Sequence, residues 1–135
     1  MAATIPPSHR DLFDKKALAH LAVHLADGSI LVNPVWCLAE GDSIVINSAQ
    51  GRLKDRAMRR NPRVSLCIVD PDSPYRYLEV RGRVHEITAQ GADAVIDRLA
   101  RKYMGVEKYP RRPGRARGGA GHAARRLEAT CPPRP

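Results

Sequence analysis

The sequence predicts a mainly β fold of the α+β type, in which five antiparallel strands form a barrel. A short helix is expected after the third strand, and a C-terminal helix after the fifth. Three observations support this fold class: apolar and polar residues alternate in short runs, glycine turns separate several runs, and one late segment has helical spacing. The 135 residues correspond to one small domain. A barrel suits such strands because closure removes exposed sheet edges.

The first two expected strands cover residues 18–25 and 30–38. Asp27-Gly28 between them is a strong hairpin signal, because glycine tolerates the positive φ that such turns need. Pro34 cannot donate a hydrogen bond to a neighbouring strand, so the second strand has an irregular or edge-like point there. A planar ligand could meet exposed backbone groups at that point; a simple bulge is the alternative.

A short helix is expected between the third and fourth strands, which cover residues 43–47 and 64–70. Ser48 is a candidate N-cap, since its hydroxyl could accept a hydrogen bond from a free helix amide. The helix should end before Pro62, because the residue before a proline avoids the α region.

Arg52, Lys54 and Arg56 lie near the start of this helix. Helix amides and nearby cations can together hold an anion, so the arrangement favours a phosphate or polyanion site. A solvated basic face on a connecting helix is the alternative. Three further arginines extend the charge: Arg59, Arg60 and Arg63.

The fifth strand and the C-terminal helix complete the expected domain. The strand covers residues 75–88 after a rigid, proline-containing loop, and Gly82 within it indicates a bulge or a close backbone approach. Apolar side chains recur at helical spacing over residues 91–104, and Gly105 is a suitable C-terminal stop.

Positive charge is concentrated at the C-terminal end. The net charge is +9, and residues 111–135 contain seven arginines and one acidic residue. Residues 113–135 are rich in Arg, Gly, Ala and Pro and have too few apolar side chains to offset the entropy of ordering. We therefore expect a flexible arm at 1–7, a folded domain at 8–112 and a disordered tail at 113–135. Nucleic-acid binding is not favoured, because the charge is mostly a property of the tail and only 4% of residues are aromatic.

Several common kinds of site are not expected. The 3 cysteines have neither CxxC nor Cys/His spacing, so no disulfide framework or metal site is indicated. No Gly-x-Ser-x-Gly, P-loop or GxGxxG motif occurs, and no side chain is assigned a catalytic role. In the absence of a signal-peptide pattern and of a membrane-spanning apolar run, we expect a soluble cytoplasmic protein without a membrane partner.

Five motifs follow one another in a specific order between about residues 8 and 110: Asp27-Gly28-Ser29, Asn33-Pro34-Val35-Trp36, Gly51-Arg52-Leu53-Lys54-Asp55-Arg56, Val69-Asp70-Pro71-Asp72-Ser73-Pro74 and Glu79-Val80-Arg81-Gly82-Arg83-Val84. Together they resemble the deazaflavin (F420)-dependent branch of the pyridoxamine 5′-phosphate oxidase-like flavoproteins, which are FMN-binding split β-barrel proteins. The chain departs from the family in two ways. Ala57 stands where the family often has Asn, and no apolar final strand is recognisable after Arg112.

The resemblance implies that residues 8–112 form a cofactor-binding domain, with coenzyme F420 as the cofactor and FMN as the main alternative. Its ring would contact Asn33, Pro34, Val35 and Trp36. Its anionic groups would be held near Asn47, Ser48, Ala49 and Gly51 by Arg52, Lys54 and Arg56. Family members usually dimerise with the cofactor in a groove between subunits, so a partner chain would add Tyr75, Arg76, Tyr77 and Arg81.

The function implied is an F420-dependent oxidoreductase that moves a hydride between reduced deazaflavin and an activated small molecule. Such an enzyme needs few catalytic side chains, because the cofactor carries the hydride chemistry. Two alternatives stay open: an FMN-binding protein of the same family, and a non-catalytic cofactor-binding or carrier protein. A further hypothesis, which is not favoured, is nucleic-acid binding by the basic tail; such binding would be lost if the tail were removed.

Overall fold

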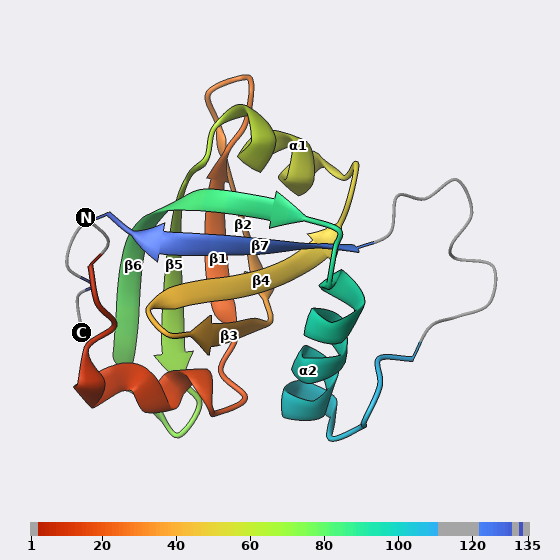
Figure 1. Cartoon of the computed structure of the whole chain (residues 1–135). Coiled ribbons are helices and arrows are strands. Elements are labelled where there is room, and N and C mark those ends of the chain that lie inside the picture. The colour runs from red at the N-terminus through yellow and green to blue at the C-terminus, as the bar shows by residue number, and fades with distance from the viewer. Residues whose placement is uncertain (1–2, 111–121, 131–132, 134–135) are drawn as a thin grey trace.

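The computed structural model describes residues 3–110, 122–130 and 133. Strands are the predominant secondary structure (Figure 1). The elements are, in chain order, η1 (Pro7–Phe13), β1 (Ala19–His24), β2 (Ile30–Val35), β3 (Cys37–Glu40), β4 (Ser43–Ala49), α1 (Leu53–Arg60), β5 (Arg63–Asp70), β6 (Ser73–Thr88), α2 (Ala92–Met104) and β7 (His122–Ala129).

The strands form one antiparallel sheet in the order β2-β1-β5-β6-β7-β4-β3. Its two edge strands, β2 and β3, are consecutive in the sequence and are separated by Trp36 alone. The sheet must therefore curl until its edges approach each other at this residue. This curled sheet confirms the predicted mainly β, split-barrel fold, although it has seven strands where five were expected.

The expected second strand is two strands in the structure. Residues 30–38 divide at Trp36, because the chain leaves one edge of the sheet there and joins the other. Pro34 lies within the edge strand β2, opposite His20 of β1, so the edge-like position predicted for it is confirmed. The expected turn occurs at Gly28, which has a φ of 89°, and Gly41, with a φ of 61°, lies in the turn between β3 and β4.

The two helices end where the sequence predicts. The helix α1 ends at Arg60, before Pro62, and α2 ends at Met104, directly before Gly105, which has a φ of 71°. Ser48 is not the N-cap of α1, and this expectation is wrong. It lies in β4 opposite Ala123 of β7, because pairing with β7 extends β4 beyond the predicted end.

The C-terminal segment contains the largest difference from expectation. Residues 122–129 form β7, between β6 and β4, so the predicted disorder is wrong for this segment. Ala123, Leu127 and Ala129 are buried, and β7 pairs with a strand on each side, so its backbone groups have partners despite the small side chains. Residues 113–121 and most of 131–135 lie outside the described residues.

The N-terminal segment is also attached to the sheet. Ala3 forms a bridge with Ala129, and Ile5 is buried and donates its backbone N–H to Asp42 Oδ1 over 3.0 Å. The expected flexible arm at 1–7 is thus wrong for residues 3–5, because β7 supplies a partner for the chain there. The short 3-10 helix η1 docks on the barrel through the buried side chains of Leu12 and Phe13.

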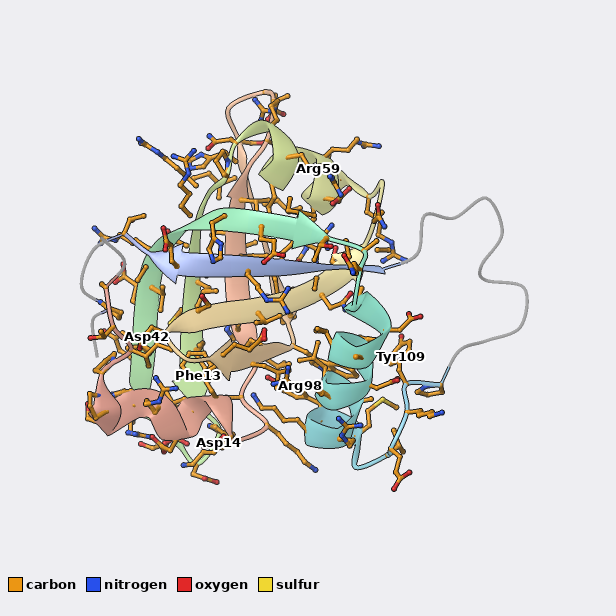
Figure 2. All side chains as sticks on the ribbon, viewed as in Figure 1. Phe13, Asp14, Asp42, Arg59, Arg98 and Tyr109 are labelled. Atoms are coloured by element: carbon orange, nitrogen blue, oxygen red, sulfur yellow. The ribbon has the colours of Figure 1, made fainter. Side chains whose placement is uncertain are left out.

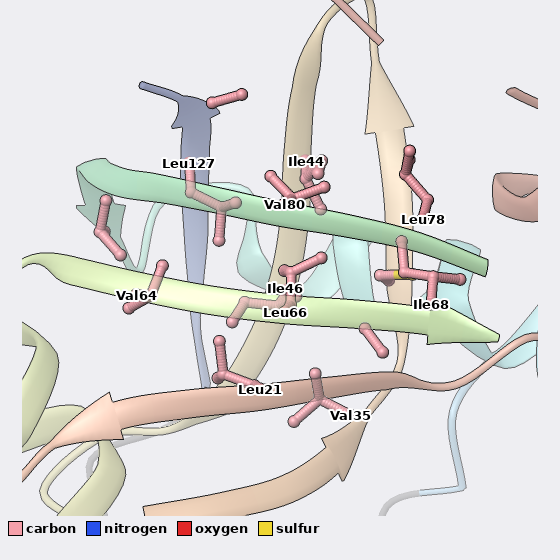
Figure 3. Packing of buried hydrophobic residues seen from close by; sticks show 14 of the residues in the cluster. Leu21, Val35, Ile44, Ile46, Val64, Leu66, Ile68, Leu78, Val80 and Leu127 are labelled. Atoms are coloured by element: carbon pink, nitrogen blue, oxygen red, sulfur yellow. The ribbon is translucent and has the colours of Figure 1, made fainter. Parts of the chain in front are cut away.

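Apolar side chains fill the inside of the curled sheet. Figure 3 shows Leu21, Leu66, Ile68 and Val80 among the residues that pack between the strands. A second, smaller cluster lies between the sheet and α2 and consists of Val45, Val95, Ile96, Leu99 and Ala124. Position 82 has no room for a side chain, because a Cβ on Gly82 would lie 2.6 Å from the carbonyl oxygen of Glu128. This close approach of β6 and β7 was one of the two predicted roles of that glycine.

Candidate functional site

The start of α1 lies at one end of the barrel and carries three cations (Figure 1). No side chain of the described residues caps the first turn of this helix. Arg52 and Arg56 are exposed and Lys54 is half-buried, and within the described part of the chain none of the three forms an ion pair. Free helix amides beside unpaired cations form an arrangement that can hold an anion.

Lys54 connects α1 to the edge strand β2. Its Nζ donates a hydrogen bond to Asn33 Oδ1 over 3.0 Å. Burial lowers the pKa of the Lys54 ammonium below its usual value, and the positive charges of Arg125 and Arg52 lower it further. This contact brings together two segments that the family resemblance assigned to one site.

Below the start of α1, a buried ion pair joins the helix to the C-terminal strand. The Arg125 guanidinium donates to Asp55 Oδ1, and neither side chain is exposed by more than 4%. Burial raises the pKa of the Asp55 carboxyl, but hydrogen bonds from Gly51, Arg59 and Arg125 outweigh it and place the pKa below its usual value. Figure 2 labels Arg59, the second cation beside this carboxylate.

Sequence reasoning missed Arg125, because the tail was expected to be disordered. One signal could have identified the strand. In residues 123–129 the side chains of Ala123, Leu127 and Ala129 fall on one face at period 2, and Arg125 occupies the same face. A lone arginine in such a row indicates a buried charge with a distant partner.

The β2–β3 corner presents a mixed surface. Pro34 is exposed, Val35 is buried in the barrel core, and Trp36 is half-buried. One face of the Trp36 indole is covered by the ring of Tyr103, and Tyr109, labelled in Figure 2, lies edge-on to it. Of the four predicted ring contacts, Val35 can therefore offer a ligand only its backbone, whereas Pro34 has an accessible side chain.

The polar groups at the end of β4 and in the following turn are mostly hydrogen-bonded within the chain. Asn47 Nδ2 donates to the carbonyl oxygen of Ala92 over 3.0 Å, and its buried Oδ1 has no hydrogen-bond partner among the described residues. The carbonyl oxygen of Ser48 accepts a hydrogen bond from Arg125 Nη1, 3.0 Å away. Ala49 is half-buried, and the N–H of Gly51 donates to Asp55 Oδ2 over 2.9 Å.

Tyr75, Arg76 and Tyr77 lie away from α1. They belong to the first part of β6, beside η1 at the opposite end of the barrel (Figure 1). Arg76 is held there by Asp11 and Asp70, at 2.6 and 2.7 Å. Arg81, further along β6, pairs with Glu79 at 2.7 Å. Within one chain these four residues do not join the site at α1.

The described residues give no indication of other chemistry. Among them, no three His, Cys, Asp or Glu side chains lie close enough together to hold a metal ion. None of the described helices is long and apolar enough to cross a membrane. What the site at α1 provides is a cationic helix start beside a partly apolar strand edge.

Comparisons with known proteins agree with this architecture. The family described as pyridoxamine 5′-phosphate oxidase matches residues 5–125. A solved structure named F420 reductase is 29% identical, with a TM-score of 0.79, and the match covers 94% of this chain and 97% of that chain. A comparison with curated protein sequences gives no match.

Two further solved structures support the fold alone, because their identities are low. A conserved hypothetical protein from Mycobacterium tuberculosis is 20% identical, with a TM-score of 0.72 and coverage of 96% of this chain and 83% of that one. The HupZ protein of group A Streptococcus is 18% identical, with a TM-score of 0.62 and coverage of 93% and 90%. The family match spans nearly the whole described domain, and the curled antiparallel sheet is the fold expected of it. The chain therefore belongs to the pyridoxamine 5′-phosphate oxidase family of split-barrel oxidoreductases.

Proposed function

We propose that this protein is an F420-dependent oxidoreductase that moves a hydride between reduced deazaflavin and an activated small molecule. The observation that carries the proposal is the 3.0 Å contact between Lys54 Nζ and Asn33 Oδ1, because it joins a cationic helix start to the β2–β3 corner. A cofactor with a flat ring and an anionic side group requires these two parts side by side. The name of the 29% identical relative favours a deazaflavin over FMN.

The residues present fit the anionic part of such a cofactor. The uncapped first turn of α1 offers backbone N–H groups, Lys54 offers a point charge, and Arg52 and Arg56 offer planar guanidinium groups. Lys54 keeps two N–H groups for a ligand, since one donates to Asn33. The cation therefore reaches the ligand from a fixed position.

The ring would lie against the β2–β3 corner. Because β2 is an edge strand, part of its backbone N–H and C=O groups face away from β1 and can hydrogen-bond the polar edge of a ring. Pro34 and Trp36 would supply apolar contact there, and Val35 would take part through its backbone. When bound, F420 would supply the hydride chemistry, while these residues orient it and limit its access to water.

In this proposal the site is completed by a second copy of the chain. Ile30 and Val32 on the outer face of β2 are 59% and 58% exposed, and Tyr75 and Tyr77 at the other end of the barrel are 93% and 42% exposed. Exposed apolar side chains of this kind are typical of a surface that another protein covers. A homodimer would cover the outer face of β2 and would let Tyr75 and Tyr77 of one copy approach α1 of the other.

The test is a titration with oxidised F420 and, separately, with FMN, followed by fluorescence at constant salt. We expect saturable F420 binding that is much tighter than FMN binding and that is lost in Lys54→Ala. Lys16→Ala, which removes the same charge from an exposed position near η1, is the control and should bind normally. Preference for FMN would assign the protein to the flavin branch of the family, and binding of neither would overturn the proposal.

Turnover separates an enzyme from a carrier. Reduced F420 is incubated with a panel of activated alkenes, and its oxidation is followed by absorbance. Turnover that is lost in Lys54→Ala supports the oxidoreductase. Tight F420 binding without turnover of any alkene would favour a cofactor-binding or carrier protein.

A further inference from the structure

Arg125 is an exception among the inward-facing residues of the barrel. Its side chain is completely buried on the same face of β7 as Leu127, where an apolar residue would be expected. Burying a guanidinium is costly unless it is paired and hydrogen-bonded. An apolar residue of similar size would avoid that cost, so the charge needs a reason beyond filling the interior.

The contacts of Arg125 indicate that reason. Its Nη1 donates to the carbonyl oxygens of Ser48 and Ala123, and its Nη2 donates to Asp55 Oδ1. Ser48 is in the last part of β4, and Asp55 is in the first turn of α1. One side chain thus holds both ends of the connection between β4 and α1, which is the segment that faces the candidate anion site.

Asp55 passes this constraint to the turn itself. Its second carboxylate oxygen accepts the N–H of Gly51 over 2.9 Å, and Gly51 has a φ of 81°, which few other residues adopt. Arg59 Nε donates to the same carboxylate over 3.1 Å from the next turn of the helix. Arg125 therefore determines where Asp55 sits, and Asp55 determines the direction of the Gly51 amide and of the first turn of α1.

We propose that Arg125, supplied by the C-terminal strand, is the positioning residue of the anion site at the start of α1, and that it acts through Asp55 and the Ser48 carbonyl rather than by touching the ligand. The inference rests on the proposed function, because it concerns the same site. It also gives β7 a role in binding in addition to its role in the sheet. The positive charge of Arg125 acts on the site as well, since it contributes to the lowered pKa of Lys54.

The test compares three variants of the full chain. Arg125→Met removes the positioning contacts, and Asp55→Asn/Arg125→Met removes both buried charges, so that neither is left unpaired if the single variant fails to fold. Arg126→Met is the matched control. It removes the same charge from the next residue of β7, whose side chain pairs with Glu40 outside the barrel. Binding of oxidised F420 and of inorganic pyrophosphate is measured for each, together with the melting temperature.

We expect the double variant to keep a cooperative melt near that of the wild type and to bind both probes roughly 10- to 100-fold more weakly, as misplaced binding groups do. Arg126→Met should bind as the wild type does. A second readout is the pH at which binding is lost, which should lie higher in Arg125→Met, because Lys54 is released from a neighbouring positive charge. That shift reports the charge of Arg125 alone; the positioning role is tested by the double variant, because a purely structural arginine would leave the affinity of a stably folded variant unchanged.

The outcomes separate the two proposals. If the wild type binds pyrophosphate but not F420, the proposed function is contradicted, and the role of Arg125 is still tested by the variants' affinity for pyrophosphate. Unchanged affinity for both probes in the double variant would overturn the positioning role. If the wild type binds neither probe, or if Arg126→Met weakens binding as much as the double variant, the inference is also overturned.

Discussion

The indole ring of Trp36 lies parallel to the phenol ring of Tyr103, with 5.1 Å between the ring centroids and an angle of 4° between the planes. Trp36 is the residue that joins the two edge strands, and Tyr103 lies in the last turn of α2. The Tyr103 hydroxyl donates to the carbonyl oxygen of Ala17 over 2.5 Å and accepts the backbone N–H of Cys37 over 3.2 Å. The end of α2 thus holds together the segment before β1 and the corner between β2 and β3.

Tyr103→Phe should therefore destabilise the protein without changing its fold. The change keeps the stacked ring but leaves the Ala17 carbonyl and the Cys37 amide without their partner, which costs about 1–3 kcal/mol for buried groups. Urea unfolding should show a lower midpoint with an unchanged slope. Tyr75→Phe is the control, because Tyr75 is 93% exposed. Equal midpoints for Tyr103→Phe and the wild type would contradict this role of the hydroxyl.

Leu127→Ala tests whether β7 belongs to the barrel core. Leu127 is fully buried in the interior cluster, and removing a buried leucine side chain costs roughly 2–5 kcal/mol. The free energy of unfolding, measured in urea, should fall by an amount in this range. Leu53→Ala makes the same change at a half-exposed position of α1 and should alter it by less than about 0.5 kcal/mol. If both variants have the same stability, the C-terminal strand does not contribute to the core.

Asp70→Asn tests the ion network between η1 and the β5–β6 turn. The backbone amide of Asp72 and the cations of Arg76 and Lys15 lower the pKa of the Asp70 carboxyl to about 2, below its usual value of about 3.9. A lowered pKa means that the carboxylate stabilises the fold above about pH 4 and that this contribution is lost as the pH falls toward 2.

The melting temperature of Asp70→Asn should therefore be below that of the wild type at pH 7, and the two should converge between about pH 4 and pH 2. Asp14→Asn, an exposed carboxylate near the same end, is the control and should melt like the wild type at pH 7. A difference between Asp70→Asn and the wild type that stays constant down to pH 2 would contradict the assignment.

The pH dependence of cofactor binding should report Lys54. Because its pKa lies below the usual lysine value, its charge is lost earlier as the pH rises, and affinity for the anion should fall there. In Lys54→Arg the cation stays charged, so this decrease should disappear while any titration of the cofactor itself remains. F420 titrations from pH 7 to pH 10 measure both curves. Parallel curves for the two proteins would exclude Lys54 as the group that titrates.

Local patterns were enough to predict much of the fold. The alternation in residues 18–25 places Leu21 and Val23 inside the barrel, as the structure has them, because side chains of a strand alternate between its faces. Gly28, Pro62 and Gly105 mark turns and helix ends correctly, since their backbone preferences act within one or two residues. The cations at the start of α1 could be recognised because they too lie within a few residues of one another.

The features that sequence reasoning missed depend on partners far away in the chain. Trp36 divides one expected strand into two only because the sheet curls and brings its edges together. Ser48 lies in a strand and not at a helix cap because β7 pairs with it. Neither relationship leaves a signal in the neighbouring residues.

The C-terminal strand illustrates most clearly the difference between local sequence signals and long-range contacts. From composition alone, an Arg-, Ala- and Gly-rich segment lacks the apolar surface that would order it by itself. In the fold, β4 and β6 supply hydrogen-bond partners on both sides, and Asp55, 70 residues earlier, neutralises Arg125. Backbone preferences and alternation are properties of neighbouring residues and can be read directly. Pairing of strands and of buried charges depends on which distant groups meet, and only the tertiary structure decides that.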